Sequence, residues 1–393
     1  MNVYVDHNAT TPLKKEVKSY MLDNMDIFGN ASSMHSNGRL ARSKIEEARS
    51  QVASLIGAEG DEIIFSSGGS ESNNTLFETM RRLAANKDGT ILQEGRRELI
   101  ISSIEHPCIL NSALFTESLG YKVHIIPVDE NGKINIEKYK EVLSENTLFV
   151  SIMMANNEIG TIQDIKNIVS LAKEKGSLVH SDAVQAAGKI PVNVKDLDID
   201  YLSLSAHKIY GPKGVGALYL KKSKGKKNPL LPLIHGGHQE DGLRAGTYNN
   251  LGILGFGKAA SLALADLDMY RENTSMLKDV LKTGLIDTIP NIKINGHMVE
   301  SLPNTLNVSF PGAEGEAILL SMDIQGIEAS TGSACASGSL EPSHVLTAIG
   351  LEPDFAHSSI RFSLGFTTKE EDIDYILKTL PPIILKLRAM STV

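Results

Sequence analysis

Short apolar runs rich in β-branched residues recur between residues 60 and 220, and stretches with helical periodicity separate most of them. Because the runs are nearly continuous in apolar residues, the strands they predict should be covered on both faces, as in a mostly parallel sheet flanked by helices. The pattern therefore predicts an α/β domain with a seven-stranded sheet. The expected strands cover residues 62–67, 98–104, 122–128, 148–155, 177–183, 201–206 and 215–220.

Two stretches outside these strands have the spacing of amphipathic helices. In residues 38–57 the apolar face would consist of Leu40, Ile45, Ala48, Val52 and Leu55. In residues 167–176 it would consist of Ile168, Val169, Leu171 and Ala172. Both helices are expected to cover the sheet.

The pattern changes after residue 260 to a long helical region, a strand at 304–310, a helix near 315–322, a strand at 359–365 and a terminal helix. This mixture predicts a smaller α+β domain. We expect a large domain at residues 15–258 and a small domain formed by residues 1–14 and 259–393.

Composition narrows the class of protein. The 393 residues carry a net charge of -8, which argues against general nucleic-acid affinity, and the basic run at 221–227 is expected to be a solvated loop. Two cysteines cannot form a disulfide framework, and the first residues lack a signal-length apolar core, so we expect a reducing compartment, the cytoplasm. Even the apolar stretch at 251–267 is interrupted by Lys258, so no membrane span is expected.

Polar residues follow the predicted strands, where parallel sheets bind their ligands. The turn "FSSGGSESNN" after the first strand could hold a phosphate through Ser67, Ser70 and the amides of a helix N-terminus, although such turns often only cap helices. His106 follows the second strand and Asn157 the fourth, and a lone histidine is more often a satisfied core residue.

The next strand ends carry Asp182 and Gln185, and then Ser205, His207 and Lys208. A phosphate cradle, an aspartate on a strand and a lysine on a tight turn are together what pyridoxal phosphate (PLP) requires. The lysine forms the Schiff base, the aspartate keeps the pyridine nitrogen protonated, and the helix N-terminus binds the phosphate.

At this level of detail the chain resembles the NifS/IscS-type cysteine desulfurases, which are PLP enzymes of fold type I that convert L-cysteine to L-alanine and an enzyme persulfide. The resemblance extends over nearly the whole chain. It is carried by "VDHNATTP", "SGGSESNN", "SIEHPCIL", "MMANNEIGTIQDI", "HSDAVQAAGKIPV", "SLSAHKIYGPKGVGALY", "HGGHQEDGLRAGT", "GSACASGSLEPSHVL" and "AHSSIRFSLG".

The resemblance implies a role for each matching residue. Lys208 would hold PLP and move protons, Asp182 would pair with the ring nitrogen, and Gln185 would hydrogen-bond the ring hydroxyl. His106 would stack on the ring and take part in catalysis. The phosphate would be bound by Gly69, Ser70, Ser205, His207 and, from the other subunit of a homodimer, Thr247. The substrate carboxylate would be bound by Asn157 and Arg361.

Cys335 would be the nucleophile that accepts the sulfur. It lies within residues 331–339, where all the remaining residues are Gly, Ala, Ser or Thr. The segment therefore has no large side chain to anchor it and should be mobile and solvent-facing. A thiol on such a segment can enter the pocket and later deliver sulfur to an acceptor protein. Cys108, in contrast, is expected to be a small buried hydrophobe.

The chain departs from the family pattern at a few positions, and other functions are compatible with the sequence. Ala31 stands where the family usually has proline, and Gly69 and Ser70 stand where it usually has Ala-Thr, but the serine keeps the hydroxyl. A selenocysteine lyase, another class V PLP enzyme or a catalytically inactive scaffold would share much of this pattern. His235 and His238 could be read as a metal pair, but they lack a third ligand of convincing spacing, so no metal is expected. The sequence does not name the sulfur acceptor, which could serve iron-sulfur assembly, tRNA thiolation or DNA phosphorothioation.

Overall fold

The structure is a computed structural model that describes residues 2–85, 95–223, 226–227, 229–331 and 342–390. Its centre is a seven-stranded sheet with the strand order β2-β8-β7-β6-β5-β3-β4. β8 is antiparallel to both of its neighbours, and the other adjacent strands are parallel. The strands are β2 (Ile63–Ser66), β3 (Glu98–Ser102), β4 (Lys122–Ile126), β5 (Thr147–Ser151), β6 (Leu178–Asp182), β7 (Tyr201–Ser205) and β8 (Gly216–Leu220). All seven predicted strands are therefore confirmed.

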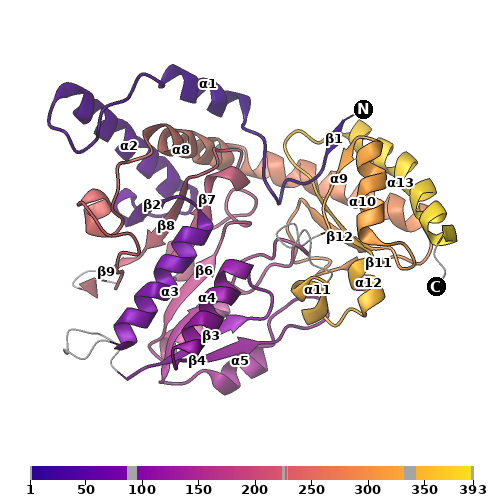
Figure 1. The fold of residues 1–393 in the computed structure, drawn as a ribbon, viewed down its shortest axis with the longest axis horizontal. Helices are drawn as coiled ribbons and strands as arrows, with labels where there is room; N and C mark the ends of the chain where they lie inside the picture. The colour runs from indigo at the N-terminus through magenta and orange to yellow at the C-terminus, as the bar shows by residue number, and fades with distance from the viewer. Residues whose placement is uncertain (1, 86–94, 224–225, 228, 332–341, 391–393) are drawn as a thin grey trace.

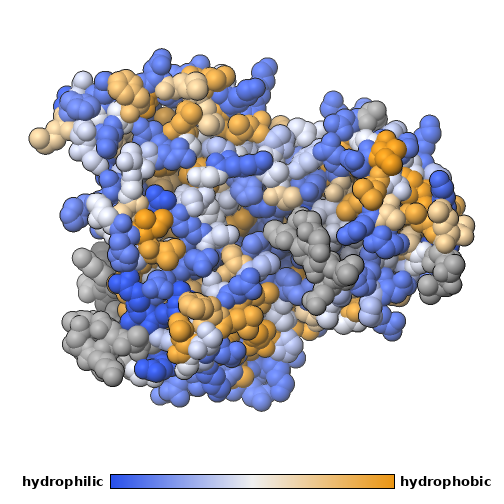
Figure 2. Space-filling model, in the orientation of Figure 1, coloured by the Kyte–Doolittle hydropathy of each residue, from blue (hydrophilic) through white to orange (hydrophobic). Residues whose placement is uncertain are grey.

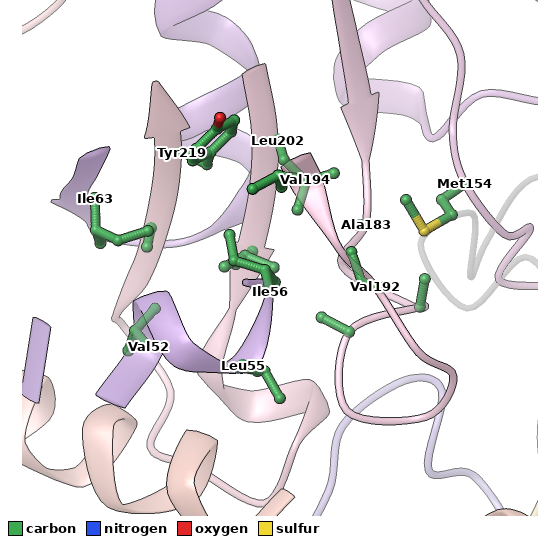
Figure 3. Close-up of a cluster of buried hydrophobic side chains, with 14 of the residues drawn as sticks. Val52, Leu55, Ile56, Ile63, Met154, Ala183, Val192, Val194, Leu202 and Tyr219 are labelled. Atoms are coloured by element: carbon green, nitrogen blue, oxygen red, sulfur yellow. The ribbon is translucent and has the colours of Figure 1, made fainter. Parts of the chain in front are cut away.

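Helices cover both faces of this sheet (Figure 1). One hydrophobic cluster joins the sheet to α2 (Ser36–Leu55), α6 (Ile165–Glu174) and α8 (Asn250–Ala265). Figure 3 shows part of it, with Val52, Leu55 and Ile56 at the end of α2 and the strand residues Ile63, Leu202 and Tyr219. A second cluster packs α3 (Gly69–Ala85) and α4 (Pro107–Ser118) against the opposite face.

The predicted face of α2 is correct except at its first position. Ile45, Ala48, Val52 and Leu55 are buried, but Leu40 is 48% exposed. The buried stripe continues through Ala41 and Gly38 instead. Ala41 lies four residues before Ile45, and Gly38 lies three residues before Ala41, so both are on the same face. A residue adjacent to Ala41 points about 100° away from that stripe.

The C-terminal part has its own hydrophobic cluster. It packs the sheet β11-β12-β14 against α9, α10 and α13, and it includes Val3 and Val5 of the N-terminal segment. Figure 1 shows the N-terminus beside these C-terminal helices. Its elements are β11 (Lys293–Asn295), β12 (Thr305–Ser309), β14 (Ser359–Ser363), α9 (Leu267–Thr288), α10 (Gly315–Ile324) and α13 (Glu370–Met390), with β1 (Val3–Tyr4) paired to β13 (Ile327–Glu328).

The predicted domain division at residues 14/15 and 258/259 stays a prediction. The second boundary falls within α8, which runs without interruption to Ala265. The remaining short elements are α1 (Lys15–Asp23), α5 (Ile136–Val142), α7 (Val194–Leu197), α11 (His344–Ala348), α12 (Pro353–His357), and the 3-10 turns η1 (Gly60–Glu62), η2 (Ala206–Lys208) and η3 (Gln239–Gly242).

Within the basic run at 221–227, the structure describes two short paired strands. β9 (Lys222–Ser223) pairs antiparallel with β10 (Lys226–Lys227). Within the described residues, no helix is both long and apolar enough to cross a membrane.

A buried ion pair fastens α2 to the segment before α8. The Arg49 guanidinium donates to both carboxylate oxygens of Glu240, at 2.6 and 2.8 Å, and the side chains are only 7% and 3% exposed. Glu240 also accepts from the backbone N–H of Phe65, and Arg49 donates to the carbonyl of Ile63. The pair therefore connects α2, β2 and η3 through one set of hydrogen bonds.

We predict that Glu240→Gln lowers the free energy of unfolding by about 3–5 kcal/mol, because it removes the buried counter-ion of Arg49 and leaves the partly exposed Glu46 carboxylate, 3.1 Å away, to balance the charge. Urea unfolding measures the effect. Glu141→Gln is the control, because Glu141 pairs with Lys138 on the surface, where both side chains are more than half exposed, and such pairs contribute less than about 1 kcal/mol. Equal losses in the two variants would contradict the role assigned to the buried pair.

Candidate active site

Lys208 lies on η2, directly after the end of β7. Its Nζ donates to two backbone carbonyls of the N-terminal segment, those of Asn8 at 2.5 Å and Ala9 at 2.7 Å. The Asn8 carbonyl also accepts a hydrogen bond from Gln185 Nε2 at 2.9 Å. Two residues predicted to bind the cofactor therefore meet at one carbonyl group.

Asp182 is the last residue of β6 and is 6% exposed. Its carboxylate accepts hydrogen bonds from Asn73 Nδ2 at 2.7 Å and from the backbone N–H of Val184 at 2.9 Å. Both donors are neutral, and no positively charged side chain in the described part of the chain forms an ion pair with Asp182. A buried carboxylate in such surroundings favours a cationic ligand group.

His106 is the N-cap of α4, where its Nδ1 accepts the backbone N–H of Cys108 at 3.2 Å. The Cys108 thiol lies 3.1 Å from the same nitrogen. Because Nδ1 accepts a hydrogen bond, the proton of a neutral ring is placed on Nε2. Burial lowers the pKa of His106, and Lys208 and His344 lower it further against the opposing effect of Asp182, so the neutral ring is favoured.

The predicted phosphate cradle is built from closely packed backbone. A Cβ at Gly69, the first residue of α3, would lie 2.7 Å from Val184 Cγ2, and a Cβ at Gly216 would lie 2.6 Å from Gly68 Cα. Glycine therefore allows the start of α3 to approach the strand ends. Ser70 lies in the first turn of α3, where backbone N–H groups are available to an anion.

Ser205 and His207 approach this region from β7 and η2. Ser205 pairs with Gly216 in the sheet, which places it beside the glycine that packs against Gly68. His207 Nδ1 lies 3.1 Å from Thr10 Oγ1, and burial together with Lys208 lowers the pKa of His207 to about 4.

Thr247 is exposed and lines a cavity of about 180 Å³ together with Ser66 and Ser67. Arg244 also lines this cavity and forms an ion pair with Glu71 of α3 at 2.9 Å. Thr247 thus lies beside the turn that leads into the predicted cradle of its own chain.

Arg361 lies in β14 and is 2% exposed. Its guanidinium donates to the Asp6 carboxylate at 2.6 Å and to the Asn157 carbonyl at 3.0 Å. The structure therefore brings together the two residues predicted to bind the substrate carboxylate, although they are separated by 204 positions in sequence.

The structure describes one of the two cysteines, Cys108. Cys335 lies outside the described residues. Cys108 is partly buried and packs against the cluster that includes α3 and α4, as expected for a small hydrophobe, but its sulfur also lies 3.2 Å from Asn73 Nδ2. Burial, with a further contribution from Asp182, raises the pKa of Cys108 to about 12, so this thiol stays protonated at neutral pH.

Sequence reasoning missed three residues of the site, namely Asn8, Asn73 and Lys189. Asn8 binds Lys208 and Gln185, Asn73 binds Asp182, and Lys189 binds both Asn8 and Gln185. All three lie inside the quoted motifs, which is the signal that could have identified them. His235 and His238 are exposed, and the described residues contain no group of three His, Cys, Asp or Glu side chains placed to hold a metal.

The residues present fit PLP. Lys208 supplies an amine at a strand end, Asp182 supplies a buried carboxylate without a cationic partner among the described residues, and the start of α3 supplies N–H groups in a gap that a Cβ at Gly69 would fill. These are the three kinds of group that the aldehyde, the ring nitrogen and the phosphate of PLP require.

Comparisons with known proteins agree with this geometry. Residues 3–376 match the family described as aminotransferase class-V. The protein named cysteine desulfurase IscS of Dictyoglomus turgidum is 48% identical over 390 residues, which cover 99% of this chain and 96% of that protein. The protein of the same name from Methanosarcina thermophila is 46% identical, with coverages of 99% and 93%.

A solved structure described as a NifS-like protein superimposes with a TM-score of 0.90 at 37% sequence identity, and the match covers 98% of this chain and all of that one. Fold, site and sequence similarity all extend over nearly the full length. The chain belongs to the aminotransferase class-V family and, within it, to the PLP-dependent cysteine desulfurases.

Proposed function

We propose that the protein removes sulfur from L-cysteine, releases L-alanine, and passes the sulfur through Cys335 to an acceptor protein. The observation that carries the proposal is the convergence of Lys208, Gln185 and Asp182 at adjoining strand ends, each in the chemical setting that its role requires. PLP, when bound, supplies an electron sink that stabilises negative charge at the substrate α-carbon.

The chain's own residues would position the cofactor and move protons. Lys208 would hold the cofactor covalently and then move protons at the α-carbon, since its Nζ is placed at the strand ends by the Asn8 and Ala9 carbonyls. Asp182 would hold the ring nitrogen in its protonated form. His106, neutral and with its proton on Nε2, would exchange protons only at that nitrogen, because Nδ1 caps α4.

Arg361 and Asn157 would bind the substrate carboxylate. A guanidinium presents five N–H donors in one plane, which suits the two oxygens of a carboxylate. The contacts of Arg361 to Asp6 and to the Asn157 carbonyl fix the orientation of that plane before substrate arrives.

A homodimer would complete the site. The segment after α1 exposes Met25, Phe28 and Met34 to 62%, 78% and 89%. Figure 2 shows apolar side chains on the surface over α1 and α2, at its upper left. Asn250 Nδ2 ties this segment to the start of α8 by donating to the carbonyls of Ile27 and Gly29, close in sequence to Thr247. A partner chain covering this exposed segment would therefore reach Thr247.

The acceptor would be a protein, such as an iron-sulfur scaffold or a thiolation enzyme. The sulfur has to travel as a persulfide on a free cysteine, and a reducing compartment such as the cytoplasm keeps that cysteine free.

We predict that Lys208→Ala abolishes the covalent attachment of PLP. The wild-type protein should be yellow and should retain a borohydride-reducible linkage to the cofactor, whereas the variant should show neither. Absorbance spectra and the mass of the reduced protein measure both properties. A reducible linkage that persists in the variant would assign the cofactor to another lysine.

We also predict that Cys335→Ala separates cofactor binding from sulfur transfer. The variant should bind PLP and cysteine but form almost no alanine, because the sulfur has no acceptor. Labelled cysteine should leave persulfide on the wild type and on Cys108→Ala but not on Cys335→Ala. Persulfide lost only in Cys108→Ala would show that the wrong cysteine was chosen.

A third prediction concerns the dimer. Thr247→Asp should block phosphate binding by like-charge repulsion, and Lys208→Ala should be inactive by itself. If Thr247 acts across the interface, dimers that contain one chain of each variant have one intact site, and mixing the two proteins after partial unfolding should restore desulfurase activity. Mixed dimers without activity would indicate that each site uses Thr247 of its own chain.

A further inference from the structure

Lys189 is a buried lysine next to the site that has no role in the proposed mechanism. It lies seven residues after Asp182, is 2% exposed, and forms no ion pair with any described acidic side chain. Its Nζ donates to Gln185 Oε1 at 2.6 Å and to Asn8 Oδ1 at 2.9 Å. Burying an amine costs free energy even when it is hydrogen-bonded, so the burial of Lys189 at this position needs an explanation.

The electrostatic surroundings favour the neutral amine. Burial lowers the pKa of Lys189, and the charges of Lys208 and Arg361 lower it further. The pKa of the neighbouring His7 is lowered to about 3, mainly by burial and further by Lys189, so His7 is neutral as well. A neutral amine has two N–H bonds, and the two amide oxygens of Gln185 and Asn8 match them.

These contacts determine which way the two amides point. The N–H bonds of Lys189 require oxygen atoms as partners, so Oε1 of Gln185 must face Lys189 and Nε2 must face the Asn8 carbonyl. A flipped Gln185 would set Oε1 against that carbonyl, which is a repulsive contact between two oxygens, and would leave Asn8 Oδ1 as the acceptor that remains for the two N–H bonds of Lys189. An amide NH₂ has two hydrogens, and the Asn8 carbonyl uses one of them.

The same lysine also orients Asn8. Asn8 Oδ1 accepts from Lys189 and from Asn304 Nδ2, so Nδ2 of Asn8 faces Thr305 Oγ1 at 2.8 Å and the Asn157 carbonyl at 3.1 Å. The carbonyl of Asn8 is thereby held beside both Lys208 and Gln185.

We propose that Lys189 is a positioning residue for the cofactor, which locks Gln185 in the orientation that donates its second N–H to the cofactor's ring hydroxyl. This inference rests on the proposed function, because it assumes that the ring hydroxyl is bound at Gln185. Lys189 itself touches neither cofactor nor substrate in this role.

The test is a pH titration of the visible absorbance of the purified holoenzyme, without substrate. In Lys189→Met the amine is lost and Gln185 can flip, so the ring oxygen loses a donor that stabilises its negative charge. We expect the midpoint of the titration to rise by about one pH unit. Lys189→Gln, which keeps an N–H donor toward Gln185, should stay near the wild-type midpoint.

The background variant Gln185→Met separates positioning from a general effect of the buried amine. Gln185→Met alone should raise the midpoint as Lys189→Met does, and adding Lys189→Met to it should cause no further change. An equal shift from Lys189→Met in both backgrounds, or none in either, would overturn the inference. If Lys189→Met does not fold, Lys189→Leu, which also removes the N–H donor, takes its place in both backgrounds and is judged by the same comparison.

Failure of the proposed function has a different result. A wild-type protein that shows no PLP absorbance would overturn the function itself. If the wild-type protein shows normal absorbance and Lys189→Met has the same titration midpoint, only the role of Lys189 is overturned.

Discussion

The site depends on the hydrogen bonds of one buried asparagine, Asn8. Its carbonyl binds Lys208 and Gln185, its side chain binds Lys189, Asn304, Thr305 and the Asn157 carbonyl, and its N–H binds Ser363 Oγ. These partners belong to the strand ends of the large sheet and to the C-terminal sheet. The N-terminal segment therefore connects Lys208, the predicted cofactor lysine, to the strands that carry Arg361, the predicted substrate arginine.

Burying so many polar groups is stable only because each has a partner. Asn8 has its side-chain oxygen and nitrogen bound at two contacts each, and removing a single partner would leave buried donors or acceptors unpaired. The network thus makes the geometry around Lys208 rigid. Rigid placement matters here because a proton carrier must stay within hydrogen-bond reach of the atom it serves.

The sequence predicted the sheet well because strands covered on both faces are apolar along their whole length. It also indicated that Asp182, Asn157 and Lys208 lie close to strand ends, because parallel strands have their carboxyl ends at one edge of the sheet. It failed where the partner is distant or the signal is ambiguous. Leu40 was predicted to be buried because it is a large apolar residue. The residue of this turn that is buried is the smaller Ala41 beside it. Lys189 reads as an ordinary surface lysine, since the partners that bury it include Asn8, 181 residues away.

The environment of Cys108 bears on which thiol carries sulfur. Cys108 is already at the site, 3.1 Å from His106, yet burial and Asp182 raise its pKa to about 12 and keep it protonated, and only a thiolate is an effective nucleophile. The chain has two cysteines. The Cys108 thiol is therefore kept protonated mainly by burial, with a further contribution from Asp182, which leaves Cys335 as the proposed sulfur carrier.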